Sequence, residues 1–287
     1  MARRAARRTG PAHRARPGRR TARDHRRRIT AARGSRTAGS NRPGSRRAPV
    51  DRRRPTPSDR RPPPPPPRRG PPPPPPRFVE DLLALQEVDQ YVALGAGLDT
   101  LALRQPEFAR RLTIFEVDQP EPQEWKRRRL VELGHGIPER LRLVPVDFEV
   151  DSWWERLRAA GFDPGRPALV ASTGVTMYLS RAANIATLEQ LARLAPGSTF
   201  VTTFLLPLDQ VGPEEQQLRR FAEDGARRSG TPFVSFFRPA ELVDLARAAG
   251  FTDARHISAA DLTARYFADR PDGLRPAESE QIMVATT

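Results

Sequence analysis

The sequence contains no cysteine and only four histidines, and these two shortages exclude several kinds of chemistry. Without cysteine there are neither disulfides nor thiolate ligands for a metal. The histidines, at positions 13, 25, 135 and 256, show no spacing typical of a metal site. No stretch approaches the roughly 20 apolar residues of a membrane span, and no apolar segment follows the N-terminal arginines as a signal peptide requires. The sequence therefore predicts a cytoplasmic protein with no metal site and no membrane span.

Lysine is also scarce, and the positive charge is carried by arginine in a very uneven distribution. Residues 1–77 contain 25 arginines and three acidic residues, a net charge of +22, whereas residues 78–287 have a net charge of −7. The first segment also contains two runs of six prolines, at residues 62–67 and 71–76, and almost no large apolar side chains. Such a segment cannot bury enough surface to offset the entropy of ordering, so residues 1–77 are predicted to be a disordered tail.

Three interpretations of this tail remain open. It is an arm that binds nucleic acid or another polyanion, a ligand for a polyproline-binding module, or the product of an upstream start or a shifted reading frame. Arginine, proline, alanine and glycine have GC-rich codons, which favours the third interpretation. The isoelectric point of 11.4 describes the tail and not the acidic body. Nucleic acid is therefore a candidate partner through the tail alone.

From residue 78 onward, strand and helix patterns alternate along the chain. Strands are expected at residues 90–94, 112–116, 141–146, 168–172, 199–205, 252–257 and 281–285. Helices are expected at residues 79–86, 100–110, 123–132, 152–160, 181–194, 213–228, 239–249 and 259–268. The alternation predicts one α/β domain, residues 78–287, with a doubly wound, mostly parallel sheet of the Rossmann-like kind. The basic run 126–129 is interpreted as a solvated helix face.

Two of the expected strands end in residues typical of ligand binding. The segment Y-V-A-L-G-A-G-L-D-T, residues 91–100, ends in a turn that contains Gly95 and Gly97. The segment L-T-I-F-E-V-D-Q-P, residues 112–120, contains Asp118, which lies 23 residues after Gly95. In a doubly wound domain such glycines let the backbone approach a ligand, and an acid on the next strand accepts hydrogen bonds from ribose hydroxyls.

The glycine string favours one adenosyl ligand over others. Its sixth position is Thr100, where a dinucleotide fingerprint has glycine or alanine, and this argues against a nicotinamide-dependent oxidoreductase. No G-K-[ST] follows, which excludes a phosphate loop. The pattern predicts an adenosyl ligand without a pyrophosphate, of which S-adenosyl-L-methionine is the obvious one.

Further candidates follow the next strands at the same expected edge. Asp147 and Phe148 come after the strand at 141–146. Because the carboxyl ends of parallel strands meet at one edge of a sheet, both are expected near Asp118. Thr176 and Tyr178 are nearest to the expected acceptor side, but the sequence offers no convincing general base, and no catalytic residue is assigned.

Six segments, taken in order, carry a resemblance to a known family. They are G-A-G-L-D-T, F-E-V-D-Q-P-E-P-Q-E-W-K-R-R-R-L, V-P-V-D-F-E, G-V-T-M-Y-L-S, P-G-S and S-A-A-D-L-T-A-R-Y-F. Together they resemble the leucine carboxyl methyltransferase family, and more closely its bacterial branch of S-adenosyl-L-methionine-dependent methyltransferases. The likeness covers roughly residues 78–287.

The resemblance implies a class I methyltransferase fold, with S-adenosyl-L-methionine as the methyl donor. It also implies that Gly95, Gly97, Asp118, Asp147 and Phe148 contact this cofactor. Asp147 would accept from the adenine amino group, and Phe148 would supply a backbone donor and an apolar contact. The expected reaction is O-methylation of a carboxylate or hydroxyl on a small molecule or a protein.

Two departures from the family pattern keep alternatives open. Many relatives carry an acid or a Trp-Leu pair before Gly174, where this chain has Ser172 and Thr173. The family also has an N-terminal helical segment over the cofactor, of which only R-F-V-E-D-L-L, residues 77–83, has a counterpart here. A degenerate or mis-started methyltransferase with weak cofactor binding, and a polyanion-binding protein that works through its tail, are therefore the alternatives.

Overall fold

A computed structural model describes residues 74–148 and 151–287 of the chain. All of the described residues lie in one unit, Pro65–Thr287. Residues 1–73 of the predicted disordered tail therefore lie outside the described residues. Its last four residues, 74–77, belong to the first helix, and the predicted domain boundary stays a prediction.

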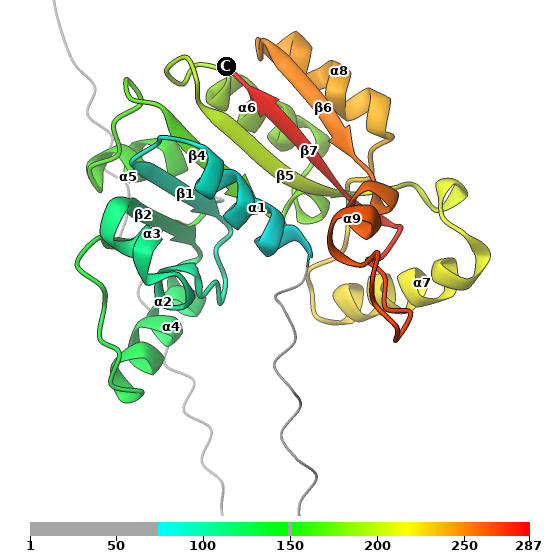
Figure 1. The fold of residues 1–287 in the computed structure, drawn as a ribbon, viewed down its shortest axis with the longest axis horizontal. Helices are drawn as coiled ribbons and strands as arrows, with labels where there is room; N and C mark the ends of the chain where they lie inside the picture. Colours follow the sequence, from blue (N-terminus) through cyan, green and yellow to red (C-terminus); the bar gives the residue numbers. More distant parts are fainter. Residues whose placement is uncertain (1–73, 149–150) are drawn as a thin grey trace, which may run out of the picture. The chain divides into compact units, whose positions relative to one another are not determined.

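The described residues form a seven-stranded sheet in the order β3-β2-β1-β4-β5-β7-β6 (Figure 1). Its strands are β1 (Gln90–Leu94), β2 (Thr113–Asp118), β3 (Leu141–Pro145), β4 (Ala168–Ser172), β5 (Thr199–Leu205), β6 (Asp253–Ile257) and β7 (Glu280–Thr286). The first five strands pair in parallel, whereas β7 is antiparallel to both of its neighbours. The doubly wound, mostly parallel sheet predicted from the sequence is confirmed.

Helices connect the strands and cover both faces of the sheet. They are α1 (Pro74–Leu85), α2 (Leu101–Arg104), α3 (Pro106–Arg111), α4 (Pro120–Glu132), α5 (Trp153–Ala159), α6 (Arg181–Leu191), α7 (Pro213–Arg228), α8 (Pro239–Ala249) and α9 (Ala259–Tyr266), with 3₁₀ turns η2 (Thr176–Tyr178) and η3 (Leu208–Gln210). Several begin at a proline, which suits the first helical turn because the N–H groups there have no partner within the helix. None of the described helices is long and apolar enough to cross a membrane.

Strand alternation divides the core into two apolar layers. On β1, Val92 and Leu94 pack into a layer with α5, α6 and α8, whereas Tyr91 and Ala93 pack into a layer with α1, α2 and α9. Figure 1 shows α1 crossing one face of the sheet while α6 and α8 lie behind the other. Because both faces are covered, these strands are buried on both sides, as parallel strands usually are.

One expected helix is broken in the structure. Residues 100–110 form two short helices, α2 and α3, instead of one, because Pro106 cannot continue a helix begun before it. The residue before the proline, Gln105, has φ −122° and ψ 72°, outside the helical region. The α2 helix that follows the glycine turn is consequently only four residues long.

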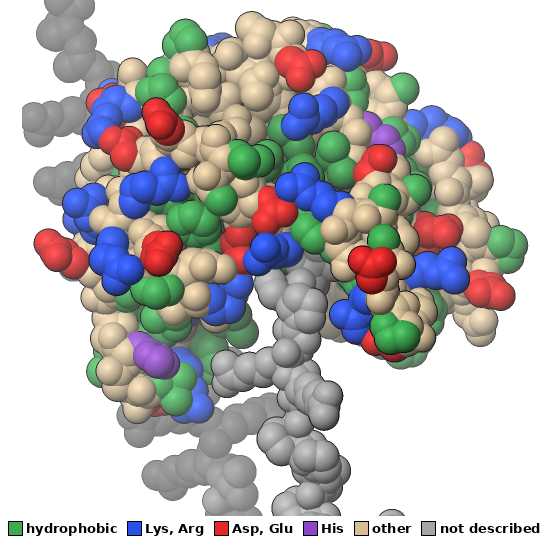
Figure 2. Space-filling model, in the orientation of Figure 1, with side chains coloured by type: hydrophobic (Ala, Val, Ile, Leu, Met, Phe, Trp, Pro, Cys, Tyr) green, Lys and Arg blue, Asp and Glu red, His purple; other side chains and the backbone are tan. Residues whose placement is uncertain are grey.

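The strand order reverses at the β1–β4 pair, so the crevice typical of doubly wound folds is expected at the carboxyl ends of these strands. The glycine turn follows β1 at this edge. Figure 2 shows basic and acidic side chains interspersed over the visible face of the body, without a large field of one sign. The visible face therefore has no basic patch of the kind that marks a nucleic-acid-binding surface.

Candidate functional site

The glycine turn after β1 has a geometry that only glycine accommodates easily. Gly95 and Gly97 have φ of +69° and +50°, in the left-handed region. The backbone N–H groups of Gly95 and Ala96 both donate to the Val117 carbonyl, at 2.8 and 3.2 Å. A Cβ atom on Gly95 would lie 2.3 Å from Val175 Cγ2. The first glycine therefore allows the turn to lie directly against the loop that follows β4.

Asp118 ends β2 and joins this turn through its side chain. One carboxylate oxygen accepts a hydrogen bond from the Gly97 backbone N–H, and the other accepts from the Gln119 N–H at 2.7 Å. A carboxylate has about four acceptor positions, so two of them remain for a ligand. The side chain is only partly buried. The structure thus brings together the three residues that the sequence pattern singled out first.

Asp147 and Phe148 reach the same edge from β3. The Val146 N–H donates to the Asp118 carbonyl at 2.8 Å, which fixes the end of β3 beside the end of β2. Asp147 is partly buried, and its backbone exchanges hydrogen bonds with Asp151 at 2.7 and 3.2 Å. Phe148 is 37% exposed, so its ring lies at the surface and is not ordinary core. All five candidate residues therefore lie around one end of the sheet.

The loop after β4 is held by hydrogen bonds to β5 and α6. The Gly174 N–H donates to the Thr203 hydroxyl at 2.7 Å, and the Thr176 hydroxyl donates to the Thr203 carbonyl at 2.8 Å. Asn184 in turn donates to the Thr176 carbonyl at 3.0 Å. Thr176 is buried and its proton is already committed, so its role is structural, whereas Tyr178 is 48% exposed. The aromatic residues Phe204 and Phe237 belong to the core.

Glu116, two residues before Asp118, has a separate role. The residue is 2% exposed, and its carboxylate forms an ion pair with Lys126 of α4, while Gln123 donates to its backbone carbonyl at 2.7 Å. Burial raises the pKa of Glu116 to about 7, and the Lys126 ammonium opposes this rise. The basic run 126–129 was expected to form a solvated helix face, and for Lys126 this expectation is wrong, because its side chain is buried against Glu116. It is the only lysine of the chain, a signal that could have marked it as exceptional.

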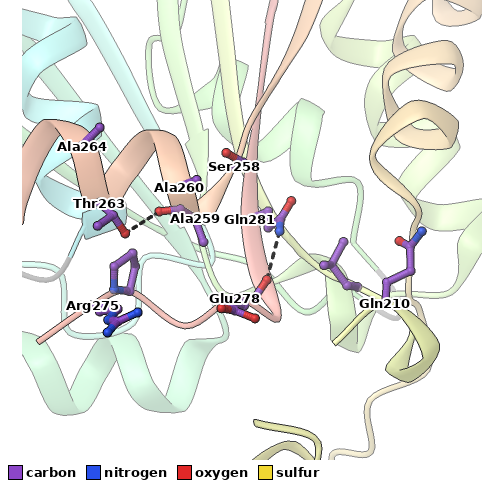
Figure 3. A pocket seen from close by; sticks show the side chains of 11 residues that line it. Gln210, Ser258, Ala259, Ala260, Thr263, Ala264, Arg275, Glu278 and Gln281 are labelled. Carbon is purple, nitrogen blue, oxygen red and sulfur yellow. Dashed lines mark hydrogen bonds between the residues drawn. The ribbon is translucent and has the colours of Figure 1, made fainter. Parts of the chain in front are cut away.

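A pocket of about 540 Å³ opens at the same edge of the sheet, farther along, beyond β5 and β6 (Figure 3). It is lined by Leu206, Gln210, Ser258, Ala259, Ala260, Thr263, Ala264, Arg275, Pro276, Glu278 and Gln281. Figure 3 shows that two of its polar side chains bond within the wall: Thr263 donates to the Ala259 carbonyl at 2.8 Å, and Gln281 donates to the Glu278 carbonyl at 3.0 Å. Among the described residues, no group of three His, Asp or Glu side chains is placed to hold a metal ion.

Comparisons with known proteins agree with this geometry. Residues 76–192 match the family model "Leucine carboxyl methyltransferase". An inferred S-adenosyl-L-methionine-dependent methyltransferase of Bacillus subtilis, YktD, is 31% identical over 191 residues, which are 66% of this chain and 62% of that protein. A similarly named protein of Mycobacterium marinum is 38% identical over 141 residues, 49% of this chain and 43% of that protein. The chain thus spans less than two thirds of the length of these relatives.

The solved structures support the fold alone. An O-methyltransferase family protein from Burkholderia thailandensis superposes with a TM-score of 0.50 at 14% identity, covering 73% of this chain and 54% of that one. The sheet order, with antiparallel β7 between β5 and β6, is accordingly that of a class I methyltransferase fold. The predicted resemblance to the leucine carboxyl methyltransferase family is confirmed over residues 76–192, which contain the first four of the six sequence segments.

Proposed function

We propose that residues 78–287 form an S-adenosyl-L-methionine-dependent methyltransferase that methylates an oxygen acceptor. The observation that carries this proposal is the junction of the glycine turn with Asp118 at the switch point of the sheet. The absence of a side chain on Gly95 lets the turn lie directly against Val175, and the Asp118 carboxylate keeps acceptor capacity beside the turn. These features fit an adenosyl group that lacks a pyrophosphate.

Each candidate residue has a role that its surroundings support. Gly95 and Gly97 let the backbone approach the ligand, and the Asp118 carboxylate accepts from the ribose hydroxyls. Asp147 accepts from the adenine amino group, and the exposed Phe148 ring gives the base an apolar contact. When bound, S-adenosyl-L-methionine supplies a methyl group that is already activated by its sulfonium, so the protein mainly needs to align the acceptor and exclude water.

A carboxylate acceptor is favoured over a hydroxyl because it needs no general base. The hydroxyl of Thr176, one of the two side chains expected on the acceptor side, is already committed to the Thr203 carbonyl. The pocket beyond β5 has a volume within the range of about 300–1,000 Å³ that small-molecule sites occupy, and it opens at the same edge of the sheet as the proposed cofactor site. A labelled methyl ester would release its label in alkali, whereas a methyl ether would keep it, so this treatment distinguishes the two acceptors.

The cofactor site is tested by calorimetric titration of S-adenosyl-L-methionine into the full chain. Asp118→Asn should weaken binding by at least about tenfold, because the asparagine amide group would place an N–H group against one of two backbone donors, Gly97 N or Gln119 N. Asp253→Asn, at an exposed position that opens β6 at the opposite edge, is the control and should bind like the wild type. No binding by the wild-type chain would contradict the proposal and favour the degenerate alternative.

A further inference from the structure

Helix α1 carries a buried acid that takes no part in the site described above. Glu80 is 3% exposed, although it is charged. One of its carboxylate oxygens accepts from the guanidinium of Arg104, and the other accepts from the side-chain amide of Gln105 at 2.9 Å. Arg77 lies at the margin, 4.0 Å away. A buried carboxylate with several charge-assisted partners holds those partners in place, because leaving any of them unpaired is costly.

The partners of Glu80 lead directly to the glycine turn. Arg104 also donates through Nε to the Thr100 hydroxyl at 2.7 Å. Thr100 is the last residue of the G-A-G-L-D-T segment and the N-cap of α2. This helix has only four residues, far fewer than the roughly 12–15 that an isolated helix needs for stability. Its position, and that of the turn before it, must therefore be set by contacts such as these.

We propose that Glu80 is a positioning residue for the nucleoside ligand: it fixes Arg104, and through it Thr100, so that the glycine turn keeps its ligand-binding shape. The proposal rests on the proposed function, since it assigns the turn to an adenosyl group. Glu80 itself lies on a different element and acts only through the residues that it holds. Its contribution is therefore expected in ligand affinity and in the rigidity of the turn.

The next residue on α1 provides a matched control. Asp81 is also an acid with several partners, but it accepts from the Tyr266 hydroxyl at 2.7 Å and from Arg265 at 3.0 Å. Both partners lie on α9, which walls the pocket beyond β5, and among the described residues this helix makes no hydrogen bond to the glycine turn. Asp81 also pairs with Arg77 at 3.2 Å, so the two acids share this half-exposed arginine. Asp81→Asn and Glu80→Gln otherwise remove one negative charge from the same helix but release different elements, α9 and α2.

The experiment compares the wild-type chain, Glu80→Gln and Asp81→Asn by two measurements. Hydrogen exchange of the amides of residues 95–100 is followed without ligand, and S-adenosylhomocysteine is then titrated into each protein. Glu80→Gln should speed exchange in the turn and weaken binding by about tenfold, the effect of losing one charge-assisted hydrogen bond. Asp81→Asn should leave both measurements near those of the wild type. Thr100→Val should add little in the Glu80→Gln background, because both act through one chain of contacts.

The outcomes separate this inference from the proposed function. Unchanged exchange and unchanged affinity in Glu80→Gln would overturn the positioning role. Equal effects of the two substitutions would also overturn it, because they would indicate a general contribution of α1 to stability. Faster exchange only in Glu80→Gln, in a chain whose wild type binds no S-adenosylhomocysteine, would support the positioning of the turn and contradict the adenosyl ligand instead.

Discussion

Gly95→Ala is the substitution whose cost can be worked out most directly from the structure. The residue has φ +69°, where a side chain costs about 1–2 kcal/mol. The new Cβ would also lie 2.3 Å from Val175 Cγ2, whereas ordinary contacts are 3.4–4 Å. Relieving an overlap of this kind costs about 1–3 kcal/mol. The free energy of unfolding should therefore fall by about 2–5 kcal/mol, and the turn should move away from Val175.

Gly97→Ala is the matched control for the steric part. Gly97 has φ +50°, but a Cβ atom there would meet nothing within 4 Å. The free energy of unfolding of this variant should fall only by the cost of a side chain at positive φ, about 1–2 kcal/mol. The double variant Gly95→Ala/Val175→Ala should regain most of the free energy of unfolding that Gly95→Ala loses through overlap with Val175. The effect of Val175→Ala alone is measured separately and subtracted.

Urea unfolding followed by circular dichroism measures each of these differences, and titration of S-adenosylhomocysteine reports whether the turn still binds. Affinity should fall at least tenfold in Gly95→Ala and partly return in the double variant. If Gly95→Ala and Gly97→Ala were equally destabilised, and Val175→Ala restored nothing, the packing of the turn against the β4 loop would be refuted as the reason for glycine at position 95.

Three further results are expected. The pKa of Glu116 is raised from 4.5 to about 7, so between these values the folded state binds a proton that the unfolded state has lost. The free energy of unfolding should therefore fall as the pH rises from about 4.5 to about 7. Glu116→Gln should flatten this pH dependence, measured by urea unfolding at several pH values. Tyr266→Phe removes the hydroxyl that donates to Asp81 and should cost about 1 kcal/mol in thermal unfolding without changing ligand affinity. Removal of residues 1–77 should abolish any salt-dependent binding of polyanions measured by filter retention, and binding that persisted would contradict the assignment of that activity to the tail.

The sequence predicted best what depends on local pattern. The strands at 90–94, 168–172 and 199–205 lie where their apolar and β-branched residues placed them. The helix at 239–249 also has the predicted ends, with proline at its start and Gly250 as its C-cap at φ +115°. In each case the residues that begin or end the element lie in the element or directly next to it in the sequence.

What the sequence did not predict depends on distances across the fold. The contact between Gly95 and Val175 joins two loops that are far apart in the chain, and no local pattern records it. The burial of Lys126 requires Glu116 on a neighbouring element, so a run of four basic residues was taken for a uniform solvated face. Glu80 was likewise only one acid in a short helical segment, and its importance is visible only once α2 is seen beside it.

The hydrogen bonds of Asp118 show how the candidate site is prepared before any ligand binds. Its two carboxylate oxygens each accept from a backbone N–H group, one on the glycine turn and one on its own strand end. The side chain is therefore already fixed, and a ligand does not have to order it at the cost of conformational entropy. The same bonds make the turn depend on the charge of the acid. Loss of the Asp118 carboxylate should consequently be detected as faster amide exchange at Gly97 even in the absence of ligand, whereas a residue that only touched the ligand would leave the free turn unchanged.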